Sequence, residues 1–175
     1  MGDSSYGGDS SSVASQLTSG VSQIFSTRYT FAALKSDGSV VTWGDSLYGG
    51  NSSSVASRLT SGVTQIFSIG SAFAALKSNG SVVTWGSSDW GGDSSSIASQ
   101  LSSGITQISS TYWAFAALKS DGSVVTWGGA DSSSVASQLS SGVTQIFSTG
   151  GAFAALKSDG SVAIVTGKQI GRAHV

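Results

Sequence analysis

Phe73-Ala-Ala-Leu-Lys-Ser-Asn-Gly-Ser-Val-Val-Thr-Trp-Gly86 is the stretch that decides the fold, and the chain carries four close copies of it. Asn79-Gly80 separates two β-prone runs, which is a strong signal for a β-hairpin. Asn-Gly and Asp-Gly favour a type I′ turn, because both central residues of that turn need positive φ angles. The other copies carry Asp37-Gly38, Asp121-Gly122 and Asp159-Gly160 at the same place. The sequence therefore predicts four hairpins with one turn chemistry.

Both faces of the predicted hairpin carry apolar side chains. A two-residue turn pairs Lys77 with Val82 and Leu76 with Val83, and side chains alternate between the two faces along each strand. Leu76 and Val83 then share one face, while Phe73 and Val82 share the other. A hairpin exposed to water on one side would alternate apolar and polar residues more strictly. We therefore expect both faces to be covered.

The hairpin belongs to a longer repeat. Phe31, Phe73 and Phe115 stand 42 residues apart, and Phe153 follows after 38. Each unit also contains a Ser-Ser-Val-Ala-Ser-Gln-Leu type of segment, predicted as one or two helical turns with a strand as the alternative, and then a β-rich segment. Periods of 20 to 50 residues are typical of stacked or circular repeats. We expect one repeat domain over residues 1–166, with units of about 1–43, 44–85, 86–127 and 128–166.

The expected fold class is all-β: a propeller-like ring of four repeats, each with a β-hairpin, a further strand and a short helix or helical turn. Residues 1–8 resemble the segment that follows a Trp-Gly, whereas the repeat ends inside a hairpin at 161–166, and this offset favours closure. A monomer that closes four units and a homodimer that completes an eight-unit ring both fit the sequence. Residues 167–175 match nothing upstream and are interpreted as a non-repeat tail, such as a cloning scar.

Composition narrows the class of function. The net charge is −1, only 10% of the 175 residues are charged, and Cys, Glu and Pro are absent. A chain without a basic stripe is a poor match for nucleic acid, and no apolar run reaches the length of a membrane span. Abundant Ser and Gly with few charges are common in repetitive surface proteins. We expect an extracellular or cell-surface location, no nucleic-acid partner and no membrane span.

No pattern in the sequence predicts catalysis, a cofactor or a metal site. The single histidine, His174, lies in the tail, and no general base recurs beside the many serines, which are expected to form turns and caps. The segment 44–51 places oxygen ligands around glycines in the manner of a calcium loop, but its charge is low. Loop geometry, with an Asp capping the next helix, is the favoured interpretation. The chain is predicted not to be an enzyme.

The repeat resembles that of the regulator-of-chromosome-condensation (RCC1) family of β-propellers, in a short bacterial-type variant with four repeats. The resemblance rests on Val63-Thr-Gln-Ile-Phe67 and on the segment from Ala72 to Gly86, with its Leu, Asn/Asp-Gly, Val and Trp-Gly positions. It recurs in all four units, to about Val162, and implies a propeller blade. A Phe stands where the family usually has a His, and Tyr-Gly-Gly or Trp-Gly-Gly replaces its Gly-Gln-Leu-Gly loop. Nucleotide exchange on a small GTPase and chromatin docking are not expected to carry over.

Positions that differ between near-identical repeats are the candidate binding site. They lie between the first strand and the hairpin, and in the loop after Trp-Gly, where aromatic content varies from unit to unit. Exposed aromatic residues on a rigid scaffold suit contacts with protein or carbohydrate. Packing against neighbouring loops, or neutral variation, is the alternative. The predicted ligand-binding residues are Arg28, Tyr29, Tyr48, Trp90, Tyr112 and Trp113.

The leading functional hypothesis is a non-enzymatic repeat or scaffold module, part of a larger repetitive surface or extracellular protein, that mediates interaction or assembly. The alternative is a protein- or carbohydrate-binding propeller that uses the variable aromatic loop residues. An enzyme is the third hypothesis, disfavoured because no base recurs near a nucleophile.

Overall fold

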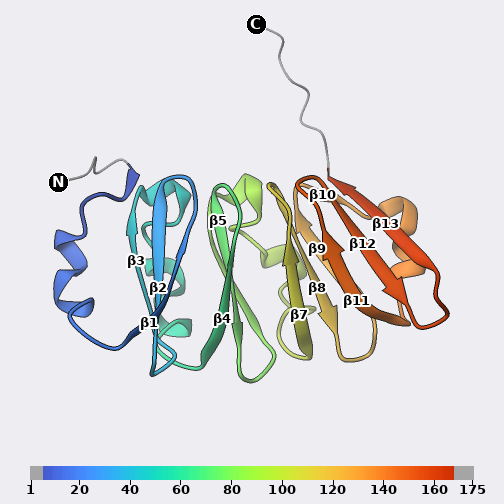
Figure 1. Ribbon diagram of the computed structural model, residues 1–175, viewed down its shortest axis with the longest axis horizontal. Helices are drawn as coiled ribbons and strands as arrows, with labels where there is room; N and C mark the ends of the chain where they lie inside the picture. Colours follow the sequence, from blue (N-terminus) through green and yellow to red (C-terminus); the bar gives the residue numbers. More distant parts are fainter. Residues whose placement is uncertain (1–5, 168–175) are drawn as a thin grey trace, which may run out of the picture.

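The structure is a computed structural model and describes residues 6–167. Its strands form four antiparallel sheets, one for each copy of the hairpin, set side by side in a row (Figure 1). The first and fourth sheets lie at opposite ends of this row. Among the residues described, no helix is long and apolar enough to cross a membrane.

Each of the first three sheets has three strands in sequence order. The first sheet consists of β1 (Val21–Ser26), β2 (Thr30–Lys35) and β3 (Val40–Gly44). The second consists of β4 (Val63–Ser68), β5 (Ala72–Lys77) and β6 (Val82–Gly86). The third consists of β7 (Ile105–Ser110), β8 (Ala114–Lys119) and β9 (Val124–Gly128). β-branched and aromatic residues dominate the third strand of each of these sheets, as expected for strands, whereas the central strand is rich in alanine.

The fourth sheet gains a strand, in the order β10-β13-β12-β11. Its strands are β10 (Ala130–Asp131), β11 (Val143–Ser148), β12 (Ala152–Lys157) and β13 (Val162–Gly167). β10 follows the third hairpin directly and pairs with the end of β13, where Ala130 lies opposite Gly167. Strand β13 therefore runs one residue past the predicted end of the repeat, and the rest of the predicted tail lies outside the described residues.

The segment before each first strand is helical, as the sequence predicts, and the helices are of the 3-10 type. They are η2 (Ser11–Gln16), η4 (Ser53–Arg58), η6 (Ser95–Ile97) and η7 (Ser133–Leu139). Two further short helices, η3 (Ser46–Tyr48) and η5 (Ser88–Trp90), follow a Trp-Gly. An Asp or Asn stands two residues before the start of each of the first four: the Asp9 carboxylate, for example, accepts from the Ser11 N–H at 2.8 Å. These side chains satisfy amide groups that a helix start leaves unpaired.

The register of the hairpin differs by one residue from the predicted register. Leu76 pairs with Val82, and Phe73 pairs with Trp85. The rings of Phe73 and Trp85 stack on one face, with centroids 5.1 Å apart. A one-residue shift moves side chains to the opposite face of the partner strand. Both faces still carry apolar groups, so the expectation that both are covered does not depend on the register.

The turn explains this shift. The Gly80 N–H donates to the Lys77 carbonyl, and the Lys77 N–H donates to the Ser81 carbonyl, both at 2.9 Å. Gly80 has a φ of +74°, whereas no residue other than glycine has a positive φ in the described part of the chain. The predicted type I′ turn is therefore wrong, because the loop is a type I turn closed by a left-handed glycine. The Asn79 side chain holds Ser81 in this loop by accepting its N–H at 3.0 Å.

Three apolar cores fill the spaces between successive sheets. In the second sheet, Phe73, Val83 and Trp85 pack toward the first sheet, while Ala74 and Val82 pack toward the third. The third and fourth sheets share the remaining core. Sheets that cover one another in sequence are the arrangement of propeller blades, so the all-β, propeller-like fold class is confirmed. Closure of the row into a ring stays a prediction.

Candidate ligand-binding surface

The loops between the first two strands of each sheet lie side by side. We call residues 27–29, 69–71, 111–113 and 149–151 the inner loops. The Arg28 N–H donates to the Gly70 carbonyl at 3.3 Å, the Gly70 N–H to the Tyr112 carbonyl at 3.4 Å, and the Tyr112 N–H to the Gly150 carbonyl at 3.0 Å. This ladder of main-chain bonds aligns four loops that are far apart in the sequence. It places the variable side chains of the inner loops on one continuous surface.

Arg28, Tyr29 and Tyr48 come together with Tyr6 in a first aromatic cluster. The Tyr29 ring lies 4.6 Å from the Tyr48 ring and 5.4 Å from the Tyr6 ring, centroid to centroid. The guanidinium carbon of Arg28 lies 5.3 Å from the Tyr29 centroid, within the range of a cation–π contact. Tyr29 and Tyr48 are half-buried, while Arg28 and Tyr6 are exposed. The aromatic and cation–π contacts of these residues are therefore made largely with one another.

Trp90, Tyr112 and Trp113 form a second aromatic cluster. The Trp90 and Trp113 rings lie 4.9 Å apart and are tilted, and Tyr112 meets Trp113 edge to face at 6.3 Å. Tyr112 is 67% exposed and Trp113 is 44% exposed. These are large apolar groups to leave in water, and together they form the more accessible of the two clusters. The glycine at position 70, in the inner loop of the second unit, stands between the clusters.

Local hydrogen bonds hold the second cluster's loop in place. The Thr111 hydroxyl accepts from the Trp113 N–H at 3.2 Å and from the Ala114 N–H at 3.1 Å. Thr111 itself is buried. Hydroxyl-to-backbone bonds of this kind fix a tight turn without help from the rest of the loop. The aromatic side chains are thus presented from a rigid turn, which lowers the entropy that a partner must overcome on binding.

Two hollows adjoin these loops. One, of about 450 Å³, lies among all four inner loops and is lined by Arg28, Gly70, Tyr112 and Gly150 among others. The other, of about 620 Å³, is lined by Tyr112 and Trp113 together with Gly150, Gly151, Thr166 and Gly167. Small residues on one side and aromatic faces on the other leave room for a ligand group beside the second cluster.

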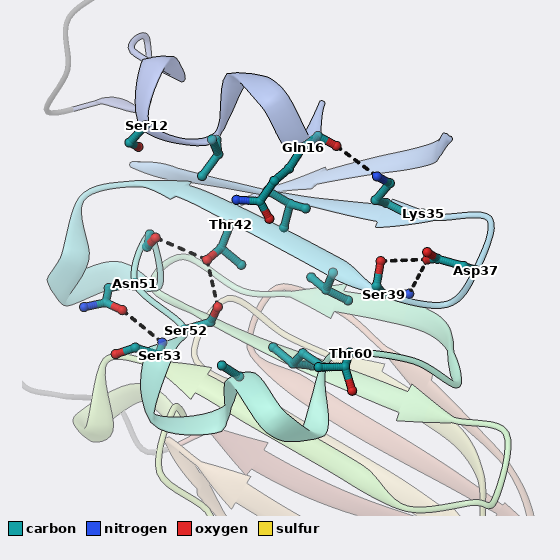
Figure 2. Close-up of a pocket in the computed structure, with 16 residues that line it drawn as sticks. Ser12, Gln16, Lys35, Asp37, Ser39, Thr42, Asn51, Ser52, Ser53 and Thr60 are labelled. Carbon is teal, nitrogen blue, oxygen red and sulfur yellow. Dashed lines mark hydrogen bonds between the residues drawn. The ribbon is translucent and has the colours of Figure 1, made fainter. Parts of the chain in front are cut away.

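A third hollow, of about 630 Å³, lies elsewhere, between η2 and η4 over β3 (Figure 2). Several of its polar groups are paired: the Thr42 hydroxyl with Ser52 at 3.0 Å, and the Lys35 ammonium with the Gln16 carbonyl at 3.0 Å. Among the described residues that line it, no pair of ionisable groups is arranged as a nucleophile with a base. Residues 6–167 contain no group of three or more His, Cys, Asp or Glu side chains placed to hold a metal ion.

Carboxylates of the hairpin turns are engaged in the turns themselves. The side-chain and backbone hydrogen bonds from Ser39 lower the pKa of Asp37 below its ordinary value, and Ser123 and Ser161 act in the same way on Asp121 and Asp159. Each Asp accepts from the hydroxyl of the Ser two residues later at 2.6 Å. These groups are exposed and serve the local backbone, in agreement with the sequence interpretation.

Solved structures show where this fold occurs. No protein-family model and no curated protein matches the chain. The ectodomain of the receptor kinase CR4 from Physcomitrella patens aligns at a TM-score of 0.53 and 15% identity, over 87% of this chain and 42% of that one. Prp20p from Saccharomyces cerevisiae, also called yeast RCC1, aligns at a TM-score of 0.53 and 16% identity, over 82% of this chain and 44% of that one. The fold is that of RCC1-type propeller repeats.

Human WBSCR16 is similar to the same degree, at a TM-score of 0.52 and 17% identity, over 82% of this chain and 47% of that chain. The chain therefore spans less than half the length of these RCC1-type and other propeller structures. The resemblance inferred from the Leu, Asn/Asp-Gly and Trp-Gly positions is confirmed at the level of fold. At such low identity, the likeness identifies no activity or partner.

The structure brings all six sequence-predicted residues to two clusters, three residues in each. The prediction of a ligand-binding role for them stays a prediction. Tyr6 was absent from the predicted set, although it stands at the repeat position of Tyr48 and Trp90. Its position in the repeat is the signal that could have added Tyr6 to the predicted set.

Proposed function

We propose that this RCC1-type chain is a non-enzymatic scaffold whose inner-loop surface binds a protein partner, with the second cluster as the main contact. The supporting observation is the exposure of Tyr112 and Trp113 on a turn fixed by Thr111. Trp and Tyr are enriched among the residues that dominate binding energy in protein interfaces. An extracellular or surface setting agrees with the low charge and the abundance of Ser and Gly.

The known binding behaviour of one propeller supports this proposal by analogy. Yeast Prp20p has been described for its binding to Gsp1p and to histones, and for its complex with Kap60. Function on a shared fold resides in the loops rather than in the framework. The loops here differ from the family pattern, so the partner of this chain is expected to be a different one.

A carbohydrate is the second candidate ligand. The hollow of about 620 Å³ places the rings of Tyr112 and Trp113 beside Thr166 and glycine backbone. A sugar presents an apolar face that can stack on an aromatic ring, and hydroxyls that can bond to backbone and Thr groups. This combination favours a neutral sugar over a charged one, because none of the described residues that line the hollow is charged.

The test is a binding screen against displayed peptides and a glycan array, followed by titration of each hit. The double variant Tyr112→Ala/Trp113→Ala should weaken a genuine hit by about 1,000-fold, since residues that dominate an interface each contribute about 2 kcal/mol. Leu47→Ala, an exposed apolar residue outside both clusters, is the control and should leave affinity unchanged. A peptide hit supports the first candidate and a glycan hit the second. Hits that survive the double variant would overturn both.

A further inference from the structure

The two sheets at the ends of the row each expose a face that the inner sheets bury. Ile24 in the first sheet is 60% exposed, whereas Ile66, at the same repeat position in the second, is 2% exposed. Val162 in the fourth sheet is 52% exposed, whereas Val82, its equivalent in the second, is 2% exposed. The sequence is almost the same in each case. What differs is the presence of a neighbouring sheet.

The two bare faces are complementary halves of one interface. We call the face of each sheet that is turned toward the next sheet in the sequence its leading face, and the opposite face its receiving face. Within the row, each leading face packs on the receiving face of the next sheet. Between the first and second sheets, the leading face supplies Leu34, Phe25 and Val40, and the receiving face supplies Ile66 and Phe73 among others. The fourth sheet's leading face has no partner, nor has the first sheet's receiving face, as far as residues 6–167 are described.

Their apolar residues correspond to those of the internal interfaces except at Ile164. The other sheets carry Thr42, Thr84 and Thr126 at that position, and these hydroxyls bond to Ser52, Ser94 and Ser132 of the next unit. The bare leading face of the fourth sheet carries Phe147, Leu156, Val162 and Ile164. The bare receiving face of the first sheet carries Leu17, Val21, Ile24 and Phe31. The receiving face also carries Lys35, opposite Val21. Its ammonium donates to the Gln16 carbonyl, as that of Lys77 donates to the Arg58 carbonyl in the enclosed second sheet. Contiguous apolar patches of this kind on a folded protein mark sites of association.

Main-chain hydrogen bonds between units point to the same pairing. The Val63 N–H donates to the Gly38 carbonyl at 3.0 Å, and this bond recurs from Ile105 to Gly80 and from Val143 to Gly122. The next bond of this series would run from the Val21 N–H to the Gly160 carbonyl. These two groups make no main-chain bond of this type within the described chain, because they belong to opposite ends of the row.

The inner-loop ladder ends in the same way. Each rung runs from an N–H of one unit to a carbonyl of the next, and the last rung present is from Tyr112 to Gly150. The bond that would continue it runs from the Gly150 N–H to the Arg28 carbonyl. Neither group takes part in another rung in the described residues. Both series of bonds would therefore continue from the fourth sheet to a first sheet placed against it.

Turn glycines supply an independent observation. A Cβ on Gly38, Gly80 or Gly122 would lie 2.7 to 2.9 Å from the backbone nitrogen of a glycine in the next unit. A Cβ on Gly160, the fourth member of this series, would meet nothing within 4 Å. The last turn thus carries the same glycine that allows the other three turns to lie close to the next unit.

We propose that a second copy of this chain covers both bare faces. The leading face of the fourth sheet docks on the receiving face of the first sheet of the other copy, and the reverse contact forms at the same time. The result is a two-fold ring of eight sheets with four sheets from each copy. The chain's own first sheet is not the occupant here, because it lies at the far end of the row (Figure 1). One copy spans 42–47% of the similar propeller structures, so two copies make about one ring.

This inference does not depend on the proposed ligand, and its first test is the mass of the chain in solution. Sedimentation equilibrium at about 1 to 100 µM should show a species of twice 17.4 kDa. A mass of 17.4 kDa over that whole range would overturn the proposal. A series of growing assemblies would also overturn it, because head-to-tail contacts that do not close after two copies give open chains.

Charged substitutions on the two faces give the second test. Ile24→Asp and Phe147→Asp should each weaken the dimer by at least about 100-fold, because each ring contains the altered residue at both of its interfaces. Both residues are exposed in the single chain, so each variant should keep the wild-type circular dichroism spectrum. Leu47→Asp, which is exposed but lies on neither face, should leave the dimer intact.

Mixing the two variants separates this arrangement from any other dimer. In an equimolar mixture, the unaltered leading face of the Ile24→Asp chain meets the unaltered receiving face of the Phe147→Asp chain. One good interface then re-forms, and the mixture should dimerise more tightly than either variant alone. If the variants dimerise as the wild type does, or if mixing brings no gain, a different surface or partner covers these faces and the proposal fails.

Discussion

The second sheet and the first sheet carry nearly the same sequence, yet only the second is enclosed on both faces. Ile66, Phe73 and Trp85 are buried in the second sheet, whereas their equivalents Ile24, Phe31 and Trp43 are exposed or half-buried in the first. In repeat proteins, stability is the sum of what each unit contributes and what each pair of neighbours contributes. The comparison shows that the apolar face of a unit contributes its full stabilisation only when a neighbouring sheet lies against it.

Removing the same side chain from the two sheets should give the largest difference. Ile66→Ala leaves a cavity in a packed core and is expected to lower the free energy of unfolding by about 2–5 kcal/mol. Ile24→Ala at low chain concentration should lower it by less than about 1 kcal/mol, because that side chain is mostly in water already. Chemical denaturation of both variants checks this prediction. Equal losses in dilute solution would mean that the first sheet is enclosed even in the single chain.

Turn glycines offer the second matched pair. Gly80→Ala forces a left-handed alanine and brings its Cβ within 2.9 Å of the Gly104 nitrogen, so we expect a loss of about 2–4 kcal/mol. Gly160→Ala has the left-handed strain alone, at a φ of +84°, and should lose about 1–2 kcal/mol. The measurement is again the denaturation midpoint. If Gly160→Ala costs as much as Gly80→Ala, the close approach between units is not what distinguishes the two turns.

Acid should act differently on the second turn than on the other three, and this is the smallest of the expected effects. The lowered pKa values of Asp37, Asp121 and Asp159 mean that these groups stabilise the fold above about pH 3.8. That stabilisation is lost as the pH falls through the lowered pKa values. Asn79 makes the same bonds to Ser81 without titrating.

The variant with Asp37→Asn, Asp121→Asn and Asp159→Asn tests this difference. Its melting temperature should fall less steeply than that of the wild type between about pH 5 and about pH 2. Asp89→Asn, a carboxylate outside the turns, is the control and should keep the wild-type slope. Parallel curves for the triple variant and the wild type would show that the turn carboxylates do not contribute to the acid dependence.

Much of the fold was predictable from the spacing of a few residues. The Asp-Gly and Asn-Gly pairs locate the turns, the recurring Phe gives the period, and apolar residues on both faces predict sheets covered on two sides. The register was not predictable in the same way. Whether Ser81 belongs to the turn or to the strand depends on the hydrogen bonds of the Asn79 side chain and of the Lys77 N–H together. An Asn-Gly or Asp-Gly pair fits both turn types.

The candidate site was predictable as a set of residues but not as two clusters. Variation among repeats singles out Tyr29 and Tyr48, but their contact depends on how the inner loop and η3 approach each other at the end of the sheet. The difference in exposure between Tyr29 and Trp113 arises from tertiary packing. Trp113 lines a hollow together with Gly150 and Gly151 of the following unit, and these small neighbours leave its ring open to solvent.

The rungs that join successive inner loops consist of main-chain atoms alone, from Arg28 through Gly70 and Tyr112 to Gly150. Side chains at these positions can change without breaking the joint, as the presence of Arg, Gly and Tyr there already demonstrates. A duplicated or deleted unit would meet its neighbours through the same joint. The length of such a protein can therefore evolve in whole steps while each loop diversifies independently, which separates the construction of the molecule from the evolution of what it recognises.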